Sequence, residues 1–154
     1  MPTISAAIIM FENYEKYLTF LNTKLEKFFN EQKPYICCKR GCSKCCQNAE
    51  FPYSELEASY LLQGIKNLDS QTQQKINENI KKTKQNKQQF NGKKFLYTCP
   101  FLIDNVCIVY QYRGIVCRTF GLIANDSSEN AKLPFCYAEG LNYSNVVDIE
   151  KNQI

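Results

Sequence analysis

The sequence contains no histidine and no tryptophan. Without histidine it lacks the commonest nitrogen ligand for metals and the usual general base, so Ser/His and Cys/His nucleophilic pairs are excluded. No apolar stretch is long enough to cross a membrane, and residues 1–10 lack the basic and long apolar regions of a signal peptide. We therefore expect a cytoplasmic chain that makes no membrane contact and binds any metal through thiolates.

Cysteine, by contrast, is abundant. The 154 residues include nine cysteines, five of them in the ten-residue stretch 37–46. In a reducing compartment a dense and odd-numbered set of cysteines indicates metal or redox chemistry rather than a disulfide scaffold. Soft thiolates suit zinc, iron and iron–sulfur clusters alike. The sequence thus predicts a metal or cluster site and leaves the identity of the metal open.

The length and the periodicity predict a mainly α-helical single domain spanning residues 1–154. Apolar residues at helical spacing predict an N-terminal helix within 1–33, which ends before Pro34. Ser54 and Glu57 form a capping-box pattern for a second helix that ends near Leu68.

Residues 70–90 predict a third helix that is polar and basic. From Lys66 to Lys94 there are eight lysines against Asp69 and Glu78, a net charge of +6, whereas the whole chain carries +4. Such a face suits nucleic acid or an acidic protein partner. Because no aromatic residues are interleaved for base stacking, we favour a solvated helix over a nucleic-acid surface, with a protein partner as the alternative.

A short β-hairpin is expected after Gly92. The apolar runs 101–103 and 106–110 flank Asp104-Asn105, which predicts a two-residue turn. In this register Cys107 lies opposite Leu102. The expected fold class is therefore mainly α with a short hairpin, organised around a cysteine core at 37–137.

The cysteine spacing resembles a known family. Cys38-x3-Cys42-x2-Cys45-Cys46 is followed by Cys99-Pro100, by Cys107-Ile108-Val109-Tyr110, by Arg113 with Cys117-Arg118, and by Cys136. This order is similar to the YkgJ-type cysteine-cluster family, described as a zinc- or iron-chelating domain. The resemblance implies eight metal ligands: Cys38, Cys42, Cys45, Cys46, Cys99, Cys107, Cys117 and Cys136.

The resemblance leaves Cys37 as the free thiol and places Gly114 where the family usually has proline after arginine, which predicts a looser turn. Some members of the family are labelled oxidoreductases, and a similar pattern occurs in the longer flagellin lysine N-methylases. Because Cys45 and Cys46 are adjacent, their side chains are expected to diverge, so that both bind one metal only if the loop bends sharply.

Three functions are compatible with these residues. The first is a protein that holds iron, zinc or an iron–sulfur cluster for electron transfer or for metal or cluster handling. The second is a structural zinc module whose basic helix meets a partner. The third is a cluster-dependent modifying enzyme, for which the sequence shows no catalytic constellation and no phosphate-binding glycine loop.

Overall fold

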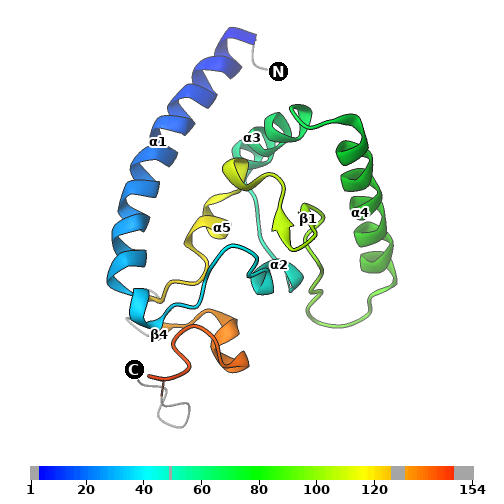
Figure 1. Cartoon of the computed structure of the whole chain (residues 1–154). Coiled ribbons are helices and arrows are strands. Elements are labelled where there is room, and N and C mark those ends of the chain that lie inside the picture. The colour runs from blue at the N-terminus through cyan, green and yellow to red at the C-terminus, as the bar shows by residue number, and fades with distance from the viewer. Residues whose placement is uncertain (1–3, 49, 126–130, 148–154) are drawn as a thin grey trace. The chain divides into compact units, whose positions relative to one another are not determined.

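The structure, a computed structural model, describes residues 4–48, 50–125 and 131–147 (Figure 1). Residues 1–37 and 121–154 belong to one compact unit, and residues 38–120 form a second. Both the mainly helical class and the hairpin are confirmed. Among the described residues, no helix has the length and apolar character needed to span a bilayer.

The helices and strands follow one another along the chain without a large sheet. The α-helices are α1 (Ile4–Glu31), α2 (Lys44–Gln47), α3 (Glu55–Lys66), α4 (Ser70–Gln89) and α5 (Ile115–Thr119). The 3-10 helices are η1 (Lys33–Tyr35), η2 (Tyr110–Tyr112) and η3 (Phe135–Glu139). The strands are β1 (Leu102–Ile103), β2 (Val106–Cys107), β3 (Ala124–Asn125) and β4 (Ala131–Lys132).

Helix α1 confirms the predicted N-terminal helix. Its buried stripe consists of Tyr14, Leu18 and Leu25, which recur at the spacing of one helical face. Phe28, three residues after Leu25, is 45% exposed.

Polar side chains hold together the unit that contains both ends of the chain. The side-chain amide of Asn142, which is only 1% exposed, accepts a hydrogen bond from the N–H of Cys37 at 2.8 Å. It also donates one to the carbonyl of Gly121 at 2.8 Å. The N–H of Tyr143 donates to the carbonyl of Tyr35 at 2.8 Å. The bonds to Cys37 and Tyr35 join segments about a hundred residues apart in the sequence, and the bond to Gly121 spans 21 residues, so a few polar groups fix the path of the loops.

In the unit 38–120, α3 begins as the sequence predicts. The Ser54 hydroxyl accepts the N–H of Glu57 at 3.3 Å, and the Glu57 carboxylate accepts the N–H of Ser54 at 2.9 Å, which completes the capping box. The buried residues of α3 are Tyr60, Leu61 and Gly64. Leu62, next to these residues in the helix, is 54% exposed.

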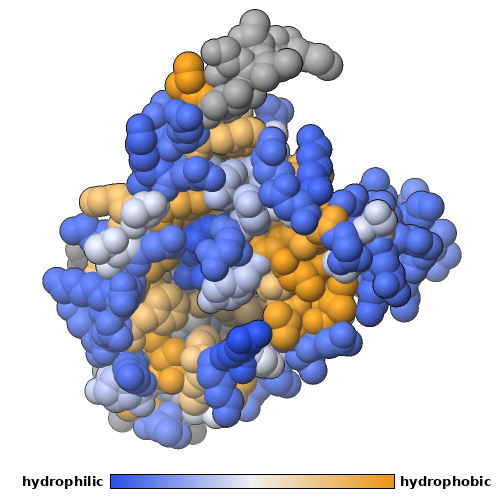
Figure 2. Space-filling model, turned by 45° about the horizontal axis from the view of Figure 1, so that its top comes forward, coloured by the Kyte–Doolittle hydropathy of each residue, from blue (hydrophilic) through white to orange (hydrophobic). Residues whose placement is uncertain are grey.

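Helix α4 is anchored along a narrow stripe and is otherwise polar. Asp69 caps its first turn by accepting the N–H of Thr72, and Ile76 is 1% exposed. The side-chain amide of Asn79 donates to the carbonyl of Pro100 at 3.0 Å. In Figure 2 this helix forms the strongly hydrophilic lobe on the right. Phe90, which the sequence pattern added to the apolar stripe, is 41% exposed.

The hairpin has the predicted register, with Leu102 paired to Cys107 in antiparallel strands. Asp104 and Asn105 both have positive φ, 50° and 60°, which suits the two-residue turns of hairpins. A second two-stranded ladder, in which Ala124 pairs with Lys132, has no counterpart in the sequence prediction.

A single carboxylate joins α3 to α5. Besides its bonds to Ser54, Glu57 accepts the N–H of Ile115, the first residue of α5, at 2.8 Å. Burial alone would raise the pKa of this carboxyl, but the hydrogen bonds from the Ser54 and Ile115 N–H groups outweigh it and lower the pKa. The helix that carries Cys117 is therefore fixed to the start of α3 through Glu57.

Replacing Glu57 by alanine is expected to destabilise the fold by about 1–2 kcal/mol, the range for a lost helix cap. Because the folded state lowers the pKa, the contribution of Glu57 is present above the unfolded pKa of about 4.3 and disappears as the pH falls through the folded pKa. Urea unfolding at pH 7 and at successively lower pH checks both statements. Glu55→Ala is the matched control, since Glu55 is exposed in the same turn. Equal losses from both variants would contradict the bridging role.

Candidate metal centre

The first cysteines of the candidate centre lie on the short helix α2. The sulfurs of Cys45 and Cys46 are 4.0 Å apart, so these adjacent side chains do not diverge as expected. The carbonyl of Cys46 accepts the N–H of Cys99 at 2.7 Å. This bond brings the segment that precedes the hairpin directly onto α2.

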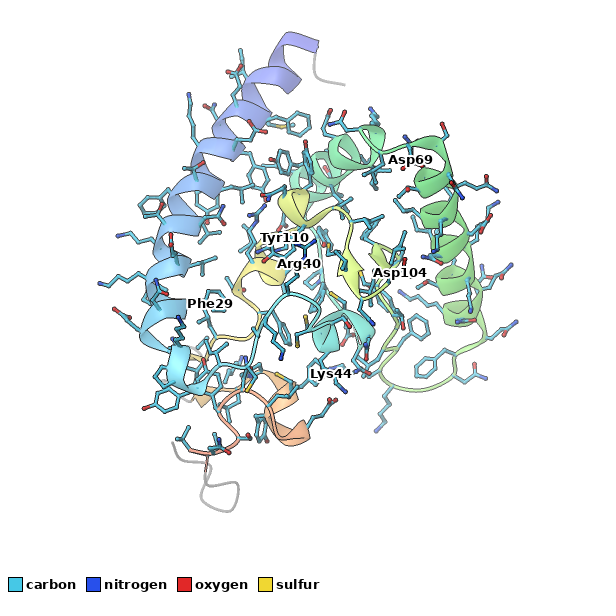
Figure 3. All side chains as sticks on the ribbon, viewed as in Figure 1. Phe29, Arg40, Lys44, Asp69, Asp104 and Tyr110 are labelled. Carbon is cyan, nitrogen blue, oxygen red and sulfur yellow. The ribbon has the colours of Figure 1, made fainter. Side chains whose placement is uncertain are left out.

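The hairpin is attached to α2 as well. The Ser43 hydroxyl, next to α2, donates to the side-chain carbonyl of Asn105 in the hairpin turn at 3.2 Å. Figure 3 labels the neighbouring charged side chains, Lys44 on α2 and Asp104 in the turn. Cys107 lies on β2, two residues beyond Asn105. The hydrogen bond between Ser43 and Asn105 therefore also holds β2, the strand of Cys107, close to α2.

Four half-buried thiols share one electrostatic neighbourhood. Burial, and to a smaller extent the charges of Cys107, Cys117 and Cys45, raise the pKa of Cys99 to about 12. Burial also raises the pKa values of Cys107 and Cys117. The negative charge of Cys45 raises both pKa values further. The charge of Cys117 also raises the pKa of Cys107. Each pair among the four thiols is therefore coupled, although they come from α2, the segment before the hairpin, β2 and α5.

The other predicted ligands are placed differently. The pKa of Cys45 is raised chiefly by its hydrogen bond with Cys46 and then by burial, so Cys46 adjoins the group of four. Cys38 and Cys42 are exposed, as is Cys37. Cys136 is buried in η3, in the unit that contains the two ends of the chain. Of the eight predicted ligands, the structure thus places Cys45 and Cys46 in contact, and the charge of Cys45 reaches Cys99, Cys107 and Cys117.

The donor chemistry of these thiols fits a soft metal, but their positions are not those of a formed coordination shell. Within the part of the chain that the structure describes, no group of three or more Cys, Asp or Glu side chains is arranged to hold a metal ion. Four sulfurs in one half-buried neighbourhood nevertheless supply the complete donor set of a thiolate site.

Arg113 provides an independent indication of negative charge at this place. Its guanidinium lies 3.4 Å from the ring centroid of Tyr110, and Nη1 donates to the Tyr110 carbonyl at 2.8 Å. Its Nε is buried and has no hydrogen-bond partner among the described residues. The charge of Arg113 lowers the pKa values of Cys107 and Cys117, against the larger effect of burial. The positive charge of Arg113 therefore favours ionisation of these two thiols.

The other basic residues near the cysteines act elsewhere. Arg118 is 5% exposed and donates from Nε to the Arg113 carbonyl at 3.0 Å and from Nη2 to the Gln111 carbonyl. It therefore supports the turn before α5. The basic side chains within the cysteine-rich stretch 37–46 are exposed: Lys39, Arg40 and Lys44.

Tyr53 is a site residue that the sequence did not reveal. Its hydroxyl lies 3.3 Å from the sulfur of Cys117, and burial and the Cys117 charge raise its pKa. The ring of Tyr53 packs against Gly114, where an added Cβ would lie 2.7 Å from Tyr53 Cε1 and 3.0 Å from Glu57 Oε1. Gly114, which we expected to loosen the turn, instead allows this close approach.

In comparisons with known proteins, no protein-family model, curated protein or solved structure matches this chain. The resemblance to the YkgJ-type cysteine-cluster family accordingly stays a prediction from the cysteine spacing.

Gly114→Ala is expected to destabilise the unit by about 1–3 kcal/mol, because the new methyl group overlaps the Tyr53 ring. Chemical denaturation measures the loss. A double-mutant cycle with Tyr53→Leu supplies the control: the smaller side chain relieves the overlap, so the alanine should cost much less in that background. A cost that is the same in both backgrounds would show that the ring is not the obstacle.

Proposed function

We propose that this protein binds a thiophilic metal, as a zinc or iron ion or an iron–sulfur cluster, and acts in metal or cluster handling or in electron transfer. The ligands we assign to the centre are Cys45, Cys99, Cys107 and Cys117. The observation that carries the proposal is that hydrogen bonds attach the Cys99 segment and the hairpin of Cys107 to α2, the helix of Cys45; the electrostatic coupling of Cys45 with Cys99, Cys107 and Cys117 supports it. Loose surface cysteines would not be gathered in this way.

The small apolar core of the unit 38–120 also supports metal binding. Among its described residues, the buried apolar side chains are Tyr60, Leu61, Ile76 and Val109. So few buried side chains stabilise a fold only weakly, and small units commonly rely on a metal or another cross-link. Metal–thiolate bonds among α2, the hairpin and α5 would join the segments that the apolar contacts leave least connected.

The charge balance fits a centre of this kind. Four thiolates around one Zn²⁺ leave a net charge of about −2, which a nearby cation stabilises. Arg113 is a cation of this kind, because its charge lowers the pKa values of Cys107 and Cys117. A bound metal keeps the thiolates ionised and can accept or donate electrons if it is iron.

The remaining predicted ligands have secondary roles in this proposal. Cys46 lies beside Cys45 and can replace it as a ligand, because the two sulfurs are 4.0 Å apart. Cys38 and Cys42 are exposed on the loop before α2, where thiols are accessible to an incoming metal. Cys136 is a ligand candidate on the family resemblance alone.

A structural zinc module with a basic contact surface is the second candidate. All eight lysines between Lys66 and Lys94 are exposed, and Lys94 forms an ion pair with Glu50 at 3.3 Å. The exposed charge favours an acidic protein partner, because long-range attraction speeds the association of oppositely charged surfaces.

Metal and acid-labile sulfide analysis of protein purified without air tests the proposal. We expect bound zinc, or iron with sulfide and visible absorption, and less of either in Cys99→Ser and Cys117→Ser. Cys37→Ser is the matched control, because Cys37 is exposed and outside the predicted ligand set. Iron with sulfide indicates a cluster, and colourless protein with zinc indicates the structural module. Equal metal content in all variants would overturn the ligand assignment.

Thiol protection gives a second test that does not depend on the identity of the metal. In the loaded protein, Cys45, Cys99, Cys107 and Cys117 are expected to resist iodoacetamide, and a chelator should expose them. Cys37 should react at the same rate before and after chelation. Peptide mass spectrometry identifies the labelled positions. Labelling of the four cysteines that chelation does not change would contradict their role as ligands.

A further inference from the structure

The last turns of α4 and the segment that follows them form a basic surface. Residues 81–97 contain six lysines and no acidic residue. The first three of these that are spaced three residues apart, Lys81, Lys84 and Lys87, are neighbours along one side of the helix. Lys94 is ion-paired with Glu50 at 3.3 Å. The six lysines that make up the basic surface are all exposed: Lys81, Lys82, Lys84, Lys87, Lys93 and Lys94.

Aromatic side chains, which α4 itself lacks, gather at its C-terminal end. Phe90 is the C-cap of α4, and from there the chain turns back towards the hairpin (Figure 1). The ring centroids of Phe90 and Phe95 are 5.3 Å apart, and the Phe95 ring is stacked on that of Tyr97 at 5.7 Å. These three rings form an aromatic row. The sequence disfavours a nucleic-acid surface because no aromatic residue is interleaved within the helix, but the folded chain places three beside its end.

Gly92 allows the Phe90 ring to lie over the turn that follows α4. A Cβ at position 92 would lie 2.4 Å from Cζ of Phe90, so a side chain there would displace the ring. Phe90 is 41% exposed, whereas Phe95 and Tyr97 are half-buried. The two half-buried rings therefore support Phe90, the most exposed of the three. Lys87 lies one turn earlier, and its carbonyl accepts the N–H of Phe90 at 3.2 Å.

Lysines beside an exposed aromatic ring match the two chemical parts of a single-stranded nucleic acid. Lysine ammonium groups attract phosphates without reading the sequence. An exposed ring stacks on a base that is free of its own neighbours, which single strands offer and duplexes do not. Acidic side chains of a protein would match the lysines alone, whereas a single strand matches the lysines and the Phe90 ring together.

We propose that the basic surface and the aromatic row together bind single-stranded DNA or RNA without sequence preference, with Phe90 stacking on a base and the lysines contacting phosphates. The site goes beyond the proposed metal-binding function and does not depend on it, because residues 81–97 contain no cysteine. It assigns a nucleic acid, in place of an acidic protein, to this end of the basic segment 66–94. DNA and RNA share the bases and phosphates on which the proposal rests.

Fluorescence anisotropy with labelled oligo(dT) and oligo(U) strands of about 12 nucleotides tests the proposal on the full chain. Phe90→Leu keeps an apolar side chain but removes the aromatic face, so binding should weaken about 5- to 100-fold. Phe90→Trp enlarges the aromatic face and should bind at least as tightly as the wild type. Phe20→Leu is the matched control. Phe20 is 60% exposed and has the Lys24 ammonium 5.5 Å from its ring centroid, but it lies on α1, so its replacement should leave binding unchanged.

The salt dependence of binding separates the lysines from the ring. For single strands, each lost phosphate contact reduces the slope of log affinity against log salt concentration by about 0.7. Lys87→Gln should show this reduction, whereas Phe90→Leu should lower the affinity and keep the wild-type slope. Both side chains are exposed, so both variants are expected to fold as the wild type does.

The proposal is overturned if neither oligonucleotide binds, if Phe90→Leu binds as tightly as the wild type, or if duplex DNA of the same length competes as well as the single strand. Polyglutamate that binds as tightly as the oligonucleotides would likewise overturn it and would indicate an acidic protein partner. Tight binding of oligo(dT), of oligo(U) or of both supports the proposal and identifies the sugar that the surface accepts.

Discussion

Hydrogen bonds from a few side chains to distant backbone groups determine how the short elements of this protein are arranged. The Glu57 carboxylate is the central example, because it accepts an N–H from its own helix start and another from α5, 58 residues further along the chain. Asn142 has the same function in the unit that contains the chain ends. With few buried apolar side chains to specify the packing, such bonds decide which segments meet. Each stabilises the fold by only about 0.5–1.5 kcal/mol, or somewhat more when the acceptor is charged.

This dependence links the fold to the candidate centre. Cys117 is on a five-residue helix, and a helix of this length is not stable by itself. Its position depends on Glu57 and on the buried Arg118, which donates to two carbonyls in the preceding turn. Cys99 is held by the Cys46 carbonyl. The backbone thus restricts the positions of Cys99 and Cys117, which would reduce the entropy cost of the proposed metal binding.

The sequence predicted the elements whose signals are local. The capping box at Ser54 and Glu57, the Asp104-Asn105 turn and the long helices each depend on residues close together in the chain, and the structure contains them. The helix α2 and the ladder of β3 with β4 were missed, because four-residue and two-residue elements have no periodicity to detect.

The spacing of the cysteines identified the candidate ligands but did not show which of them influence one another. The electrostatic coupling among four of them arises only when distant segments fold together. Tyr53 was missed for the same reason: a tyrosine before an N-cap has no feature that indicates a contact with a thiol 64 residues away. Gly114 was interpreted as a weakness in the turn, and only the position of the Tyr53 ring explains why a side chain does not fit there.

Arg113 carries a buried donor that has no hydrogen-bond partner among the described residues. A buried donor without an acceptor costs about 1–3 kcal/mol, and folded proteins rarely contain one without a reason. Arg113 Nε is in this state, next to thiols whose pKa values are raised by burial. Neutral thiols are weak acceptors, and thiolates are strong ones. The charge of Arg113 thus offsets part of the cost of ionising Cys107 and Cys117, which the proposed metal binding requires. Arg118 lies five residues further on and is already hydrogen-bonded to carbonyls, so the two arginines have separate roles.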